Sequence, residues 1–270
     1  MVQVKDILTW MEVHAPLSFS EAWDACGLQV GDPEGKVDRI LVALDASSKT
    51  LQEAETKGCQ CLLTHHPLIF RPLSAVRSDQ YPGKLVMMAL QKGVHIISMH
   101  SNLDVAQGGT NDQLARLLSL QSVEPLESAP HLRGERGYMG LGCLGTLAQK
   151  KSLKEFAAFV QVILGNIPMR VVGDWQQTVQ RVALCTGSGG GFMEQVLARK
   201  VDAYVTGDVK YHEAQRALEG GLAVLDVGHF ASERVVVEPV AEMLRHQALE
   251  RGKSILVLTS REEKDPFAVF

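Results

Sequence analysis

The stretch that decides the fold is RILVALDASSKTLQEAETKGCQCLLTHHP, residues 39–67. It opens with an apolar run of strand length, RILVALDAS, and closes with a second one, CQCLLTHHP. Between them lies KTLQEAETKG, which has helical character, and Ser47 and Ser48 can cap its first backbone N–H groups. Two buried runs joined by a helix predict a strand–helix–strand unit.

The same alternation continues on both sides of this unit. Apolar residues at helical spacing predict a first helix that ends before Pro16, and GKLVMMALQKG (83–93), VHIISMH (94–100) and NDQLARLLSL (111–120) predict a helix, a strand and a helix. The segment 121–137, with Pro125 and Pro130, is expected to be a boundary or a crossover. Strands and helices then alternate up to a long helix over 232–252 and a last strand, SILVLTS (254–260). We therefore predict an α/β fold of two similar lobes with mostly parallel sheets.

Composition narrows the class of protein. The chain has 270 residues, of which 46% are hydrophobic and 21% charged, as expected for one large or two compact globular domains. A net charge of −4 and a pI near 6.1 give no indication of binding to nucleic acid or anionic membranes, although a nucleotide substrate remains possible. Scattered cysteines, no signal-peptide pattern and no long apolar run predict a reduced, cytoplasmic protein without a membrane span.

Potential ligands follow several of the predicted strands. In open parallel sheets, ligands bind beyond the carboxyl ends of the strands. The residues in question are His65 and His66 after CLLT, His100 and Asp104 after HIISM, Asp208 and His212 after AYVTG, and His229 and Glu233 after LAVLDV. Each has an ordinary structural explanation, such as a histidine at the edge of a core or a surface His/Glu pair. Their convergence on one rim favours a metal site instead.

Imidazoles and carboxylates together suit zinc, iron or manganese. His229 and Glu233 are four residues apart, so they share one face if a helix begins there. Adjacent residues on a regular strand point to opposite sides, so His65 and His66 are expected to bind different ions of a pair. Two such ions can lower the pKa of a shared water and hold a reacting oxygen.

A glycine-rich stretch, TGSGGGFMEQV (186–196), follows a strand and opens a helix. Its backbone N–H groups could bind an anion. The stretch lacks the GxxxxGK[ST] pattern and has no lysine, which favours a tight strand–helix turn. The role of the Gly187–Gly191 loop stays open.

Several blocks of the sequence together resemble one family. CLLTHHPLIF (61–70), HSNLDVAQGGTND (100–112), TGDVKYHEA (206–214) and DVGHFASER (226–234) are similar to the signatures of the Nif-three-like (NGG-one-interacting factor three-like) family, whose members are often called GTP cyclohydrolase 1 type 2 homologues. AWDACGLQVGD (22–32) resembles its N-terminal block, with Ala25 and Cys26 where Asn-Val is more usual. The blocks occur in the family's order from about residue 18 to residue 240.

This resemblance implies a dinuclear site with two divalent ions per subunit, held by His65, His66, Asp104, His229 and Glu233. Glu233 would bridge the two ions. The resemblance also implies a toroidal homohexamer whose metal sites face an internal cavity. It further implies that residues 129–226 form the second lobe, inserted in a metal-binding lobe made of residues 1–128 with 227–270.

The resulting functional hypothesis is a metal-dependent hydrolase of the GTP cyclohydrolase type. It would open the imidazole ring of a purine nucleotide, or of a related heterocycle, and release formate. His100 and His212 are the histidines expected to transfer protons or contact the substrate. Two alternatives remain: a hexameric metal-binding scaffold or interaction protein without catalysis, and a metal-dependent phosphoesterase that uses the Gly187–Gly191 loop.

Overall fold

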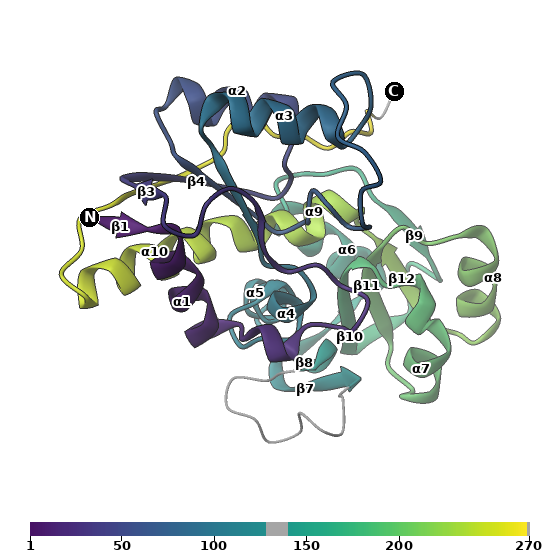
Figure 1. Cartoon of the computed structure of the whole chain (residues 1–270). Helices are drawn as coiled ribbons and strands as arrows, with labels where there is room; N and C mark the ends of the chain where they lie inside the picture. The colour runs from purple at the N-terminus through teal and green to yellow at the C-terminus, as the bar shows by residue number, and fades with distance from the viewer. Residues whose placement is uncertain (128–139, 269–270) are drawn as a thin grey trace. The chain divides into compact units, whose positions relative to one another are not determined.

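The computed structural model describes residues 1–127 and 140–268 (Figure 1). They divide into two compact units. The first unit consists of Met1–Leu103 and Val236–Lys264, and the second of Asp104–Val235 with the C-terminal residues from Asp265 onward. In chain order, the second unit interrupts the first. The units divide at residues 103/104 and 235/236, whereas the predicted boundaries were 128/129, which lies outside the described residues, and 226/227.

The first unit is built on a mostly parallel sheet, as its strand–helix–strand pattern predicted. Within the described residues, its strands in spatial order are β13 (Leu256–Thr259), β4 (Arg39–Ala43), β5 (Cys61–Thr64), β6 (His95–Ser98) and β2 (Gly27–Val30). The pairings β13–β4, β4–β5 and β5–β6 are parallel, and β2 pairs antiparallel with β6. A small sheet of β1 (Val2–Gln3) and β3 (Lys36–Val37) accompanies them. The carboxyl ends of β4, β5 and β6 therefore meet at one edge.

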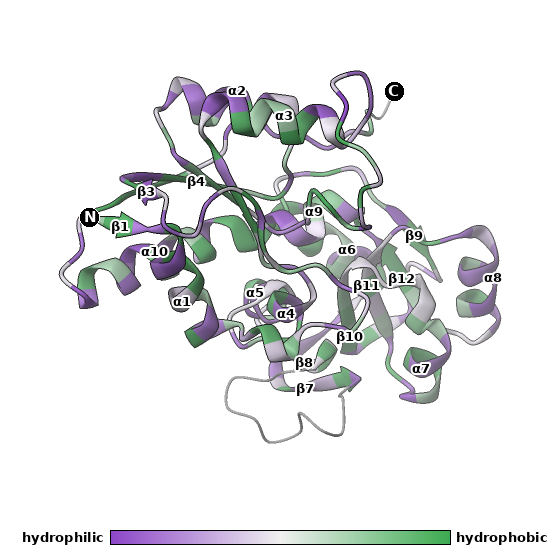
Figure 2. Cartoon of the chain, viewed as in Figure 1, coloured by the Kyte–Doolittle hydropathy of each residue, from purple (hydrophilic) through white to green (hydrophobic). Residues whose placement is uncertain are grey.

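Helices cover both faces of this sheet. Helices α2 (Ser48–Thr56) and α3 (Gly83–Lys92) lie on one face, and α1 (Val4–His14) and α10 (Val237–Glu250) on the other (Figure 1). The Ser47 hydroxyl caps α2 by accepting from the Thr50 N–H at 3.1 Å. Leu41 and Leu62 pack with Leu51 in the core beneath α2 and α3, and Figure 2 shows the hydrophobic strands between helices of mixed polarity.

The second unit has a mixed sheet. Within the part of the chain that the structure describes, its strands in spatial order are β7 (Gln121–Glu127), β8 (Leu141–Ser152), β10 (Thr178–Ser188), β11 (Ala203–Gly207), β12 (Ala223–Asp226) and β9 (Arg170–Val172). The central pairings, β10–β11 and β11–β12, are parallel, and the outer three are antiparallel. Residues 121–127, expected as boundary or crossover, form the edge strand β7, where Pro125 is tolerated because an edge strand need not donate every N–H.

Two hydrophobic cores lie on opposite faces of this second sheet. Its helices are α5 (Thr110–Leu117), α6 (Leu153–Ile163), α7 (Met193–Ala198) and α8 (Tyr211–Glu219), joined by the short helices α4 (Ser101–Asp104) and α9 (His229–Glu233). Val182 and Leu184 of β10 pack on α5 and α6, whereas Ala183 and Cys185 belong to the core beneath α7 and α8. This alternation is the two-residue period of a strand buried on both faces. Among the described residues, no helix combines the length and apolarity needed to span a bilayer.

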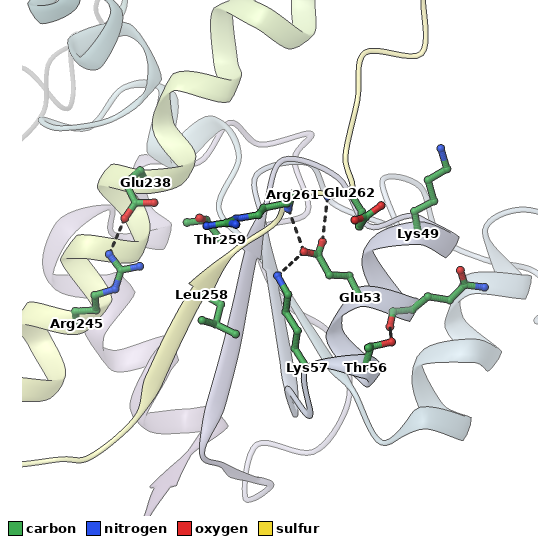
Figure 3. Close-up of a pocket in the computed structure, with 11 residues that line it drawn as sticks. Lys49, Glu53, Thr56, Lys57, Glu238, Arg245, Leu258, Thr259, Arg261 and Glu262 are labelled. Atoms are coloured by element: carbon green, nitrogen blue, oxygen red, sulfur yellow. Dashed lines mark hydrogen bonds and ion pairs between the residues drawn. The ribbon is translucent and has the colours of Figure 1, made fainter.

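Glu53 ties α2 to the end of β13 within the first unit (Figure 3). Its buried carboxylate accepts from the Ser260 hydroxyl at 2.5 Å and the Arg261 N–H at 3.0 Å, and it pairs with Lys57 Nζ at 2.5 Å. Burial alone would raise the pKa of Glu53, but the hydrogen bonds from Lys57, Ser260 and Arg261 outweigh it and lower the pKa. The ionised carboxylate therefore stabilises the folded chain.

Replacing this carboxylate should destabilise the protein in a pH-dependent way. We expect Glu53→Gln to lower the free energy of unfolding at pH 7 by about 1–3 kcal/mol, because an amide nitrogen cannot accept from buried N–H and O–H donors. Since the folded pKa is lowered, the contribution is complete above the ordinary pKa of 4.5 and is lost as the pH falls through the folded value. Urea unfolding at pH 7 and at pH 3 measures both effects.

Glu262→Gln is the matched control, because it makes the same change at an exposed carboxylate, and Glu53 and Glu262 line one surface pocket. It should unfold like the wild type at both pH values. An equal loss of stability in the two variants, or a Glu53→Gln deficit that does not shrink in acid, would contradict the assigned role of Glu53.

Candidate metal centre

Three imidazoles gather at the carboxyl edge of the first sheet. His65 and His66 follow β5, and His100 follows the neighbouring parallel strand β6. The ring centroid of His65 lies 4.9 Å from that of His66 and 5.2 Å from that of His100. One nitrogen of each ring lies within 4.8 Å of the others, close enough for one metal ion to be held by all three. The first unit therefore contains a group of imidazoles that could bind a metal ion.

The adjacent histidines do not point to opposite sides, as a regular strand would require. Strand β5 ends at Thr64, and the chain turns there, with the Thr64 hydroxyl donating to the His66 carbonyl at 2.8 Å. Strand alternation therefore does not apply to the two rings, because it ends with the strand, and the assignment of each ring to a different ion stays a prediction. His100, expected to be uncoordinated, joins the two as a third potential ligand.

Each ring of the cluster is held through Nδ1. His65 Nδ1–H donates to the Met99 carbonyl at 2.8 Å, His66 to Asp45 Oδ1 at 2.9 Å and His100 to Asp24 Oδ1 at 2.8 Å. A carbonyl or an ionised carboxylate can only accept, so the proton of each neutral ring lies on Nδ1 and Nε2 is the nitrogen that can bind a metal. Oxygen partners of this kind orient the histidine ligands of metal sites.

Asp24 is the most strongly held of these partners. Its buried carboxylate also accepts from the Ser101 N–H at 2.9 Å and from Cys26 Sγ at 3.1 Å. Burial alone would raise the pKa of Asp24, but the hydrogen bonds from His100, Ser101 and Cys26 hold it well below its usual range. Asp24 is thus a fixed anion beside His100.

The sequence alone did not identify Asp24 or Asp45 as partners of the histidines. Asp45 directly follows the end of β4, the strand next to β5, so its place at a carboxyl strand end was a usable signal. Asp24 lies in a loop with no periodic pattern, and only the resemblance of residues 22–32 drew attention to it.

The predicted ligands Asp104, His229 and Glu233 belong to the second unit. His229 and Glu233 begin and end the short helix α9, and His229 Nε2 lies 3.1 Å from Glu233 Oε2. His229 Nδ1 pairs with Asp208 Oδ2 at 2.8 Å, the same arrangement as in the imidazole cluster. The long helix expected over 232–252 is interrupted by a 3₁₀ turn, Arg234–Val236, which separates α9 from α10.

Gly187 makes room for the Glu233 carboxylate. A Cβ atom added to Gly187 would lie 2.1 Å from Glu233 Oε1 and 3.3 Å from His229 Nε2. Gly187 also has a φ of +68°, a conformation that favours glycine, and its N–H donates to the Ser232 hydroxyl at 2.9 Å. A cradle shaped around a carboxylate and an imidazole supports ligand chemistry at this point.

Other donors of the glycine-rich loop are also used inside the protein. The Gly189 N–H donates to the Thr206 hydroxyl at 3.0 Å, and a Cβ at Gly190 would collide with Glu213. The loop therefore serves the tight strand–helix turn that its sequence favoured.

Asp104 and His212 lie elsewhere in the second unit. Asp104 Oδ1 accepts from the Thr110 hydroxyl at 2.6 Å, and the Asn111 amide donates to the Asp104 carbonyl at 3.0 Å. His212 is exposed on α8, where Nδ1 lies 3.0 Å from Gln215 Oε1. It lines a groove with Glu194 and Arg216. Its catalytic role stays a prediction.

The donor set fits a divalent metal ion. Imidazole nitrogens oriented by oxygen partners, with carboxylates available, suit zinc, iron or manganese. The Cys59/Cys61 pair offers no alternative, since burial raises the pKa of both thiols and thus disfavours the thiolate that binds metals.

The chain is similar to known proteins over almost its whole length. Residues 2–266 match the family Duf34/NIF3 (NGG1p interacting factor 3). The chain is 33% identical to the GTP cyclohydrolase 1 type 2 homolog of Lactococcus lactis and 31% identical to that of Clostridium perfringens, covering 98% of this chain and 99% of the relative in both cases. A solved structure of a Staphylococcus aureus hypothetical protein is 29% identical with a TM-score of 0.91, covering 99% of each chain.

Filling the space at Gly187 should disturb metal binding. We expect Gly187→Ala to lower the affinity for Zn²⁺ by about tenfold or more, because the methyl group displaces the Glu233 carboxylate and strains a positive φ. Competition with a chromophoric chelator measures the affinity.

Gly191→Ala is the matched control in the same loop, since a Cβ there would meet no atom within 4 Å. It should bind Zn²⁺ like the wild type. Thermal unfolding of both variants separates a loss of ligand geometry from a loss of fold, and wild-type affinity in folded Gly187→Ala would contradict the role given to Gly187.

Proposed function

Since the chain belongs to the Duf34/NIF3 family, we propose that it is a metal-dependent hydrolase that opens the ring of a purine nucleotide or a related heterocycle. The observation that carries the proposal is the imidazole cluster of His65, His66 and His100, each ring oriented through Nδ1 by an oxygen acceptor. Relatives at 31–33% identity bear the name GTP cyclohydrolase 1 type 2 homolog, which suggests the substrate class.

The proposed ligand set is the one that the family resemblance implies. It consists of His65 and His66 from the first unit and of Asp104, His229 and Glu233 from the second. Two divalent ions per subunit and a homohexamer belong to the same proposal, and metal analysis with light scattering tests both. His100 lies in the same group as His65 and His66, and in this proposal it stays outside the ligand set, so that its Nε2 is available for proton transfer.

A divalent metal pair supplies an activated water at neutral pH and polarises a substrate oxygen. The chain's own residues do the remaining work. The buried Asp24 carboxylate holds the proton of His100 on Nδ1, so Nε2 can accept a proton from a reacting group, and Asp24 stabilises the imidazolium that results. Ring opening with loss of formate needs such a group, because protons must move from the attacking water to the leaving nitrogen.

A metal-binding scaffold is the alternative that keeps the same ligands. A scaffold needs no proton transfer, so replacing His100 or His212 would leave its function unchanged as long as the metal stayed bound. A phosphoesterase using the glycine-rich loop receives less support, because the Gly187 and Gly189 N–H groups donate to Ser232 and Thr206.

The hydrolase proposal predicts formate release from GTP by the metal-loaded protein. We expect His100→Gln to lower kcat about 10²–10⁴-fold, the usual contribution of a positioned acid or base, with metal content retained. His212→Gln should also lose turnover if His212 contacts the substrate. Formate assay and chromatography of the ring-opened product provide the readout.

His246→Gln is the control, since His246 is exposed on α10. It should keep full turnover. If fully metal-loaded protein produced neither formate nor a ring-opened product from GTP, the GTP version would be refuted. If both His100→Gln and His212→Gln kept their metal and their function, the scaffold would be favoured.

A further inference from the structure

Two exposed aromatic rings stand beside the imidazole cluster in the first unit. Trp23 is 59% exposed and Phe70 is 44% exposed, although large aromatic side chains normally bury most of their surface. Their ring centroids lie 5.8 Å apart, and each lies 6.2 Å from the ring of His100. Apolar ring faces are thus open to solvent next to nitrogen ligands.

The protein holds these two rings in place. Trp23 precedes Asp24, whose carboxylate is anchored by His100 and Ser101 at the end of β6. Gln29 connects the two ring-bearing segments, because its amide donates to the Ala25 carbonyl at 2.6 Å and its Oε1 accepts from the Ile69 N–H at 3.1 Å. These hydrogen bonds fix the chain segments that carry the two rings, which favours a preorganised ligand site.

We propose that Trp23 and Phe70 form a subsite that stacks the planar heteroaromatic ring of the substrate, which in the proposed function is a purine. Aromatic side chains stack on the faces of bases regardless of their sequence or substituents. The carboxylates of Asp45 and Asp24 hydrogen-bond to His66 and His100 beside the ring pair, so a neutral aromatic ring fits here without the repulsion that a phosphate would meet from them. The inference rests on the proposed function and adds the recognition element.

Guanosine binding to metal-free protein tests the subsite apart from catalysis. Equilibrium dialysis should show that Trp23→Leu and Phe70→Leu each weaken binding about tenfold, the loss of roughly one stacking contact. Gln29→Leu, which keeps both rings but removes the connection between their segments, should weaken it as well. Guanosine should also quench tryptophan fluorescence in the wild type and in Phe70→Leu at saturation, but not in Trp23→Leu.

Trp175→Leu is the matched control, since Trp175 is 50% exposed and lies in the second unit. It should bind guanosine like the wild type and keep the quenching. Thermal unfolding checks that all variants are folded.

Three results would overturn the subsite. They are wild-type guanosine affinity in Trp23→Leu and Phe70→Leu, competition by ribose as strong as by guanosine, and a change in subunit assembly of Trp23→Leu without a change in binding. The last result would make the ring pair a contact between copies of the chain.

The outcomes also separate this inference from the proposed function. Ring-dependent guanosine binding without formate release from the metal-loaded protein would support the subsite and refute the hydrolase. Formate release from GTP with an unchanged KM in Trp23→Leu would support the hydrolase and refute the subsite.

Discussion

The hydrogen bonds donated by the Nδ1 atoms of His65, His66 and His100 are the constraint on which the imidazole cluster depends. Their acceptors stand at strand ends or in the loop before β2, and parallel pairing of β4, β5 and β6 brings those ends to one edge. An imidazole without such a partner could rotate about its side-chain bonds and exchange its tautomer. With the partner, Nε2 is presented in one direction, which a metal ligand requires.

In the second unit, the conformation of the backbone positions the potential ligands His229 and Glu233. Helix α9 is only five residues long, and the 3₁₀ turn after it allows His229 and Glu233 to be placed independently of the long helix α10. Because Gly187 has no side chain, the Glu233 carboxylate can occupy the space beside it. Asp208 holds the His229 ring by a hydrogen bond. A buried carboxylate kept in place in this way suits a ligand, since an unsupported one would be costly to bury.

The loop that contains Trp23 and Asp24 links orientation to recognition. Asp24 fixes His100, and Trp23, its chain neighbour, exposes an aromatic face beside that same histidine. Strong anchoring of Asp24 therefore also sets where a stacked ring would lie relative to the imidazoles. Because the two residues are adjacent in one loop, the backbone that positions Asp24 also positions Trp23.

Much of the fold followed from local patterns. The strand–helix–strand unit at 39–67, the parallel strands and the histidines at carboxyl strand ends were all readable from periodicity and from the order of the motifs. The outer antiparallel pairings of the second sheet were not, because an edge strand such as β7 or β9 has the same local pattern in either direction. The strand β7 was not predicted, because it contains Pro125 and proline usually ends a strand.

The sequence by itself determined which residues could bind a metal and at which strand ends they stand. Only the tertiary structure decided where their rings point and what holds them. His65, His66 and His100 find their Nδ1 partners 34, 21 and 76 residues away in the chain. Beyond the last residue of a strand, no periodicity dictates a side-chain direction, so packing against such distant partners sets it.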